Sequence, residues 1–158
     1  MPTLRRFRIA ILTPLLFLAQ AFACDPMGPT AVGVVRLSPE ASAEGGLTLE
    51  VRAFAEEIMP WVGPEESLAG HEWLLESSRP LEGMTFPLEY EVGGQLGTSE
   101  HEEWRVLVWI ARSEAREVPQ SGEWFGTVTF SLDDCGILFS SYCGVAMDLE
   151  VEIDQQLP

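Results

Sequence analysis

The chain has 158 residues, of which 46% are hydrophobic and 9% aromatic, and its formal net charge is −16. This apolar and aromatic content excludes a disordered chain. So negative a charge argues against nucleic acid and against adhesion to anionic lipid surfaces, which both attract basic proteins. The length suits one domain once a targeting segment is removed.

Residues 1–23 have the order of a secretory signal peptide. Three arginines, at positions 5, 6 and 8, precede a short apolar run over 9–18, and Ala21-Phe22-Ala23 is a small-x-small cleavage pattern. The apolar run is shorter than the roughly 20 residues of a membrane span. We therefore expect residues 1–23 to be removed on export.

Cleavage after Ala23 would leave Cys24 as the first residue of the mature chain. This arrangement resembles a bacterial lipoprotein signal, in which a Leu-x-small-Cys box places the lipidated cysteine at the new N-terminus. Ala21 and Phe22 depart from that box. The resemblance implies acyl chains, such as palmitate, on Cys24 and a membrane anchor through them. The alternative is ordinary cleavage that leaves Cys24 unmodified.

The cysteine count bears on this choice, because the chain has three cysteines and an exported protein meets an oxidising compartment. Cys135 and Cys143 are close in sequence and similarly flanked, which predicts a disulfide between them. Lipidation of Cys24 would account for the odd cysteine. A bridge from Cys24 with one thiol left free, or an intermolecular bridge, are the alternatives.

The body of the chain reads as strands in sequence order. Apolar and polar residues alternate over 47–55, 86–92 and 145–154, which is the pattern of half-buried strands. Weaker strand patterns occupy 31–37 and 71–77. Residues 104–112 are apolar on both faces and predict a central strand, and 123–132 predict a strand in which Gly126 marks a bulge or a close contact.

Glycine- and proline-rich turns separate these segments, as in "SAEGG" and "SSRPLEG". Short strands with such turns predict an all-β fold, a single antiparallel β-sandwich that is immunoglobulin-like or transthyretin-like in general shape. The expected organisation is a signal peptide over 1–23, a tether over 24–30, the sandwich over 31–154 and a tail over 155–158.

Three stretches of the body carry a family resemblance: "GLTLEVRAFAEE", "HEWLLESSRPLEGMTFPLEYEVG" and "EEWRVLVWIAR". Their order over residues 45–112 resembles the strand order of YbaY-type lipoprotein domains. The resemblance implies a small β-sandwich facing the periplasm, related in shape to secretin pilot lipoproteins, with no defined catalytic residues to carry over. The long segment after residue 120 departs from that pattern.

Catalytic and metal-binding motifs give no assignment. His71 and His101 each precede a glutamate, but neither completes H-E-x-x-H, and no G-x-S-x-G elbow occurs. The acidic residues of 148–154 alternate along one predicted strand, so their carboxylates do not converge on a calcium ion. We predict no catalytic residue, no metal site and no cofactor.

The functional expectation is a non-enzymatic lipoprotein of the bacterial cell envelope. It would be anchored in the membrane through an N-terminal lipid on Cys24 and would bind or scaffold an envelope protein of unknown identity, with no nucleic-acid partner. The alternative is a secreted soluble β-sandwich that binds a glycan or Ca²⁺ without a lipid anchor. Such a glycan groove would need Trp61 and Trp73 to be exposed.

Overall fold

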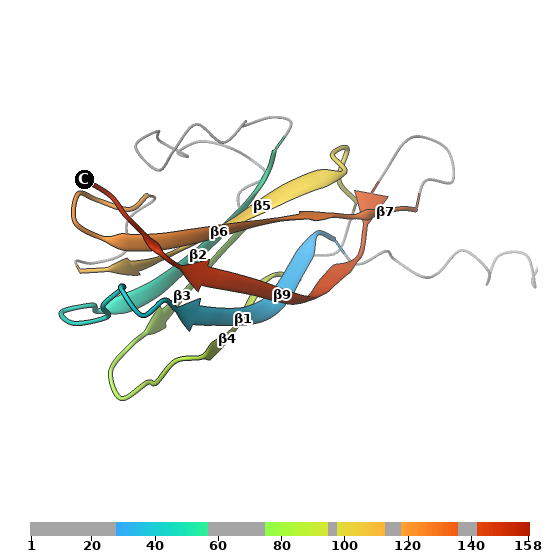
Figure 1. Cartoon of the computed structure of the whole chain (residues 1–158). Coiled ribbons are helices and arrows are strands. Elements are labelled where there is room, and N and C mark those ends of the chain that lie inside the picture. Colours follow the sequence, from blue (N-terminus) through green and yellow to red (C-terminus); the bar gives the residue numbers. More distant parts are fainter. Residues whose placement is uncertain (1–27, 57–74, 95–97, 113–117, 136–141) are drawn as a thin grey trace, which may run out of the picture.

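The computed structural model describes residues 28–56, 75–94, 98–112, 118–135 and 142–158. Within these ranges the only regular secondary structure is β-strand, and the sheets pack face to face as a sandwich (Figure 1). The all-β sandwich expected from the sequence is therefore confirmed. The expected signal segment, the tether as far as Met27, and Cys24 lie outside the described residues.

One sheet has the strand order β10-β6-β5-β2-β3, and the other has the order β4-β1-β9. A small pair, β7-β8, stands apart from them. The bounds are β1 Thr30–Leu37, β2 Thr48–Ala55, β3 Leu75–Pro80, β4 Leu88–Gly93, β5 Glu103–Ala111, β6 Trp124–Ser131, β7 Asp133–Asp134, β8 Tyr142–Cys143, β9 Val145–Ile153 and β10 Gln155–Gln156.

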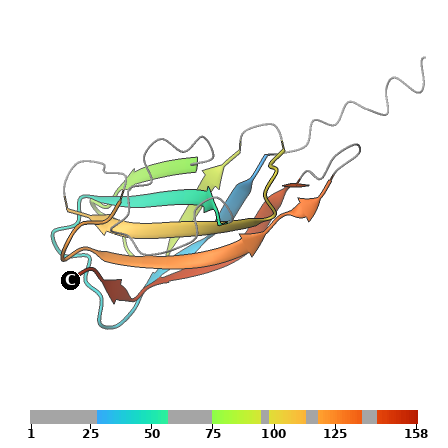
Figure 2. The ribbon, with the colours of Figure 1, turned by 90° about the horizontal axis from the view of Figure 1, so that it is seen from above.

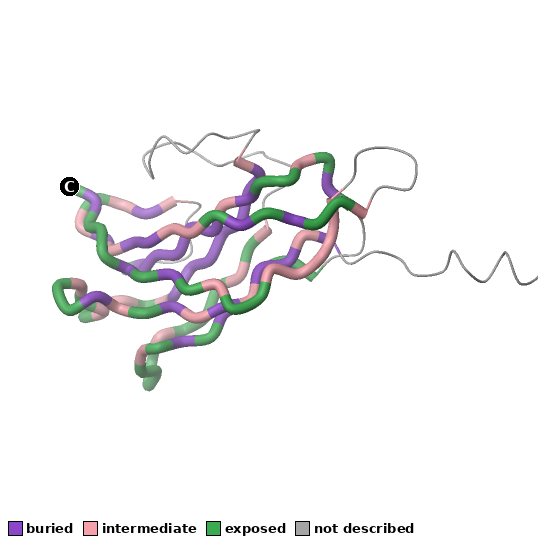
Figure 3. Tube along the Cα trace, turned by 45° about the vertical axis from the view of Figure 1, so that its right-hand side comes forward, coloured by how far each residue is buried: buried purple, intermediate pink, exposed green. Residues whose placement is uncertain are grey.

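β5 is the central strand that its sequence predicts. It lies between β2 and β6, and its side chains are buried on both faces of the five-stranded sheet. Trp104, Val106, Val108 and Ile110 point into the sandwich, whereas Leu107 and Trp109 lie on the outer face. Figure 3, which is coloured by residue burial, shows that buried residues are concentrated in the middle strands.

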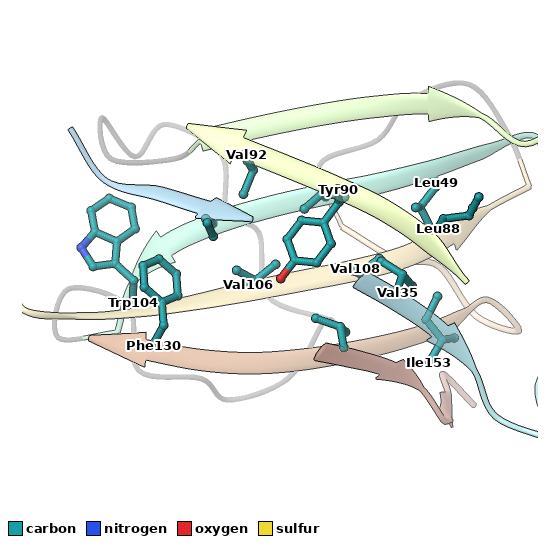
Figure 4. Packing of buried hydrophobic residues seen from close by; sticks show 14 of the residues in the cluster. Val35, Leu49, Leu88, Tyr90, Val92, Trp104, Val106, Val108, Phe130 and Ile153 are labelled. Carbon is teal, nitrogen blue, oxygen red and sulfur yellow. The ribbon is translucent and has the colours of Figure 1, made fainter. Parts of the chain in front are cut away.

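Among the described residues, the core between the sheets is built mainly from apolar side chains. Valines, leucines and aromatic rings from both sheets meet there (Figure 4). Tyr90, from β4, is 4% exposed and its hydroxyl has no hydrogen-bond partner in the structure. Burial raises the pKa of this phenol well above its ordinary value, because desolvation disfavours the phenolate.

The sandwich is not wholly antiparallel, because β1 pairs with β9 in parallel and with β4 in antiparallel orientation. One extra residue in β9 makes a bulge opposite Ala31–Gly33, and Asp148 there has φ 58°. The regular alternation expected over 145–154 was wrong for this reason: the bulge shifts it by one residue before Leu149. Ala146 packs on the core instead, and Met147 is 60% exposed.

Glycines permit two close approaches between strand backbones. A Cβ atom on Gly33 would collide with the carbonyl oxygen of Leu149, at the bulge. A Cβ atom on Gly126 would collide with the carbonyl oxygen of Glu152, where β6 lies against β9. The close contact expected at Gly126 is confirmed, and it joins the edges of the two sheets.

The C-terminal residues belong to the fold. Residues 155–158 were expected to be a tail, but Gln155 and Gln156 pair with Phe125 and Trp124 as strand β10. Leu157 is buried, its backbone N–H donates to Glu123, and its carbonyl accepts from Gly122. The expectation failed because an edge strand of two residues is too short to show an alternating sequence pattern.

The nearby Glu123 is itself a buried carboxylate with a structural role. One oxygen accepts the backbone N–H of Arg112 and the other that of Gln120, both at 2.8 Å. Two amide donors satisfy the charge, so this carboxylate ties together the backbone at the two ends of the segment between β5 and β6.

The strand directions give the sandwich two distinct ends. The disulfide end contains Thr30, Gly93–Gly94, Ser99 and Tyr142–Gly144. The loop end contains the connections 38–47, 81–87 and 118–123 and the C-terminus. Figures 1 and 2 show the C-terminus at one end of the molecule and β7 at the other.

Candidate functional site

The most unusual chemistry in the described residues lies on the outer face of the five-stranded sheet. Glu50 and Arg52 are alternate residues of β2 and point to this face, yet they are 0% and 5% exposed. The sequence pattern had predicted that β2 is half-buried with these charges in solvent. That expectation was wrong, because both faces of β2 are covered.

Glu50 and Arg52 form a connected polar group with Glu76 and Ser78 of β3 and Trp109 of β5, which we call the Glu50 cluster. Glu50 accepts a hydrogen bond from the Ser78 hydroxyl at 2.6 Å. The Arg52 guanidinium lies 3.4 Å from Glu50 and 3.6 Å from the more exposed Glu76. It also lies over the Trp109 ring, 5.4 Å from the centroid, which is cation–π geometry.

Strand pairing explains how these side chains meet. Antiparallel neighbours point to the same face, and the register places Glu50 opposite both Ser78 and Trp109, and Arg52 opposite Glu76. Residues 28 and 59 positions apart in sequence are thereby brought into contact with Glu50. One carboxylate oxygen of Glu50 and the indole N–H of Trp109 have no hydrogen-bond partner.

A second ion pair lies further along the same face. Arg105 binds Glu56 through two parallel hydrogen bonds, Nε–Oε2 at 2.6 Å and Nη2–Oε1 at 3.0 Å. An apolar patch formed by Phe54, Leu107, Trp109, Ala111 and Phe125, with Val118 packed against it, shares this face with the two charged groups. The face therefore combines paired charges with a buried apolar surface.

The predicted disulfide is supported by geometry. Cys135 and Cys143 have Cα atoms 6.0 Å apart and sulfur atoms within bonding range. β7 and β8 pair in antiparallel orientation on either side, so the chain doubles back as a bridge over eight residues requires. Residues 136–141, between the two cysteines, lie outside the described residues.

The histidines and acidic residues do not assemble a metal site in the described part of the chain. No group of three or more His, Cys, Asp or Glu side chains that could hold a metal ion occurs there. The backbone N–H of His101 donates to Ser99 and its carbonyl accepts from the Trp104 indole. His71 lies outside the described residues.

The outer face of the three-stranded sheet is acidic. Glu89 and Glu91 of β4 and Glu150 and Glu152 of β9 are exposed on either side of β1. Arg36 pairs with Glu150 at 2.6 Å, and both side chains are more than half exposed. The carboxylates lie in rows along strands, as expected of a solvent face whose charge discourages edge pairing.

The five tryptophans divide among the core between the sheets, the outer face of the five-stranded sheet, where Trp109 lies, and the undescribed residues. Trp104 and Trp124 pack on the core between the sheets, as their positions predicted. Trp61 and Trp73, which a glycan groove would require, lie outside the described residues. The groove stays a prediction.

Sequence reasoning missed the Glu50 cluster, although a signal for it exists. A strand that is apolar on both faces, such as 104–112, indicates that both faces of its sheet are covered around it. The polar residues of an adjacent strand are then candidates for burial, and opposite charges at positions 50 and 52 can satisfy each other. Only the strand order, which the pattern does not give, identifies that neighbour.

Comparison with protein-family models, with curated proteins and with solved structures gives no match for this chain. In the ranges that the structure describes, no helix is long and apolar enough to cross a membrane.

Proposed function

We propose that this protein is a non-enzymatic lipoprotein of the bacterial cell envelope. It is exported, cleaved before Cys24 and held at the membrane by lipid on that cysteine, and its β-sandwich binds or scaffolds another envelope protein. The signal-like order of residues 1–23 and the resemblance to YbaY-type lipoprotein domains both favour this role.

The Cys135–Cys143 pair carries the proposal furthest. Disulfides persist in oxidising compartments, so a bridged pair favours an exported location. It also uses two of the three cysteines and leaves Cys24 as the odd one, directly after the cleavage pattern. Acylation of the Cys24 sulfur would leave the mature protein without a reactive thiol.

A thiol count on the protein purified from its own membranes tests this proposal. We expect no free thiol before reduction, two after it, an intact mass raised by acyl chains and partition into the detergent phase. A Cys24→Ser variant is the matched control: it should keep the bridge but lose the acyl mass and the detergent partition. One free thiol and an unmodified mass that begins at Cys24 would overturn the anchor.

Thermal melting of the purified protein tests the soluble alternative. A ligand that binds only the native state increases the free energy of unfolding, by about 2.7 kcal/mol at 100 times its dissociation constant. The melting temperature rises as a result. The lipoprotein proposal expects no shift with millimolar Ca²⁺ or simple glycans. A clear upward shift on the thiol-containing, unmodified form would favour the secreted binding domain.

A further inference from the structure

The start of β1 is fixed firmly to the disulfide end of the sandwich. Thr30 is 1% exposed and its N–H donates to the carbonyl of Gly144 at 3.2 Å. Its hydroxyl donates to the Gly28 carbonyl at 3.1 Å and accepts the N–H of Gly94 at 2.9 Å. The chain is therefore held in place from Gly28 onward.

This attachment makes any anchor at Cys24 a short one. Four Cα–Cα steps separate Cys24 from Gly28, and a fully extended chain covers at most about 14 Å over that length. β1 then runs away from this point for eight residues, a rise of about 23 Å. With β1 perpendicular to the membrane, the loop end would lie about 23 Å further from the bilayer than the disulfide end.

Negative charge is exposed on one flank of the sandwich and at its disulfide end. Glu100, Glu102 and Glu103, together with Asp133 and Asp134, are exposed near the disulfide end, and the rows of Glu89, Glu91, Glu150 and Glu152 line one flank. Anionic headgroups repel both surfaces within roughly 10 Å at physiological salt. The repulsion disfavours an orientation in which the acidic flank lies on the bilayer, and it holds the acidic disulfide end off the headgroups within the reach of the tether, about 14 Å.

We infer that the protein stands on the membrane by its disulfide end, with the β7–β8 pair toward the lipid and the loop end pointing away. This orientation rests on the lipid anchor of the proposed function. It assigns the membrane-facing surface to Gly93–Gly94, Ser99 and Tyr142–Gly144. It makes the connections 38–47, 81–87 and 118–123 the surface farthest from the bilayer.

Energy transfer to labelled lipids tests the orientation. With Cys24 acylated and Cys135 bridged to Cys143, one engineered cysteine is the only thiol available to a maleimide dye. Thr98→Cys places the dye near the disulfide end and Ser121→Cys places it at the loop end, both at exposed positions. Each labelled lipoprotein is reconstituted into phosphatidylcholine–phosphatidylglycerol vesicles that contain a headgroup-labelled acceptor lipid.

We expect the Thr98→Cys label to show about twofold more transfer than the Ser121→Cys label, because the strand rise separates their heights by about 23 Å. Vesicle flotation, with the Cys24→Ser variant as the negative control, reports the anchor independently. Protein that floats with equal or reversed transfer would overturn the orientation and leave the anchor standing. Protein that does not float would overturn both.

Discussion

Glu50 and Arg52 occupy positions where charged side chains are costly. Removing two charges from water costs several kcal/mol per ion, and only close pairing and hydrogen bonds recover it. Ser78, Glu76 and the Trp109 ring supply those contacts. The cluster is therefore more sensitive to the loss of one member than to the replacement of both charges.

Substitutions of the pair test this asymmetry. Arg52→Leu should lower the free energy of unfolding by about 3–5 kcal/mol, because it leaves Glu50 buried without its ion-pair partner. The double variant Glu50→Leu/Arg52→Leu should recover most of that loss. Urea denaturation of the single and double variants measures both values. Additive losses in the double variant would show that the two charges do not act as a pair.

Tyr90 presents the opposite case, a buried hydroxyl that gains nothing from its position. Tyr90→Phe removes the unpartnered oxygen and keeps the ring, so we expect stability at pH 7 to rise by about 1 kcal/mol. Denaturant unfolding measures the change. Tyr142→Phe, at a half-buried position that packs against the margin of the core, is the matched control.

The same substitution should change the response to alkali. Burial raises the pKa of Tyr90 in the folded state above the ordinary value of 10.0. The contribution of this group to the free energy of unfolding is therefore constant below pH 10.0 and is lost as the pH rises above that value. Wild-type stability should fall by up to about 1.4 kcal/mol per pH unit more steeply than that of Tyr90→Phe. Identical slopes above pH 10 would contradict the burial of this phenol.

Among the elements, β10 decides whether the C-terminus is part of the domain. A chain that ends at Asp154 loses the pairing with β6 and the buried Leu157 side chain. We expect a loss of about 2–3 kcal/mol, of which the leucine alone accounts for most. Deletion of the exposed Pro158 alone should change the melting temperature little. Equal melting temperatures for both truncations would show instead that residues 155–158 are a tail that does not stabilise the domain.

The β7–β8 pair depends on a short covalent loop. Closing a loop of eight residues contributes about 2.5 kcal/mol in the chain-entropy model. Reduction should lower the melting temperature and leave the domain folded, as judged by circular dichroism with and without reductant. The Cys135→Ser/Cys143→Ser variant should melt at the reduced temperature under both conditions. Complete unfolding on reduction would mean that the bridge stabilises the whole domain and not only this hairpin.

The elements differ in how well the sequence specifies them. The core face of β5 and that of β4 follow from uninterrupted apolar runs or strict alternation, which one strand carries by itself. The bulge at Asp148 breaks the alternation of β9 without any local marker, because only the pairing with β1 requires it. Parallel pairing of β1 with β9 and the burial of Glu50 depend on strand order. Strand order is a property of the whole chain, and the periodicity of single strands does not contain it.

At the scale of the whole molecule, charge dominates. Removal of Arg5, Arg6 and Arg8 from the 9 basic residues leaves 6 against 25 acidic residues, a net charge of −19 for the body that follows Ala23. Such an excess keeps copies apart and destabilises the compact state through self-repulsion. Ion pairs such as Arg36–Glu150 offset only a small part of it.

Salt should therefore stabilise the protein. Raising NaCl from about 10 mM to about 1 M shortens the screening length from about 30 Å to about 3 Å. We expect the melting temperature to rise by about 3–5 °C, equivalent to about 1 kcal/mol. The variant Glu89→Gln/Glu91→Gln should start higher and respond less. A fall in melting temperature with salt would show that ion pairs outweigh the repulsion.

The parallel pairing of β1 with β9 sets the order of events when the protein is made. The first long strand of the sandwich has the last long strand as its neighbour, so the three-stranded sheet closes only after residue 153 is available. If the chain crosses a membrane from its N-terminus, β1 arrives first and waits with one edge open until the C-terminal strand follows. Native contacts of such long sequence separation form slowly, and open strand edges invite misassembly. Under the proposed export, completion of the sandwich would be coupled to completion of translocation, and a chain arrested before β9 should be a target for chaperones and proteases.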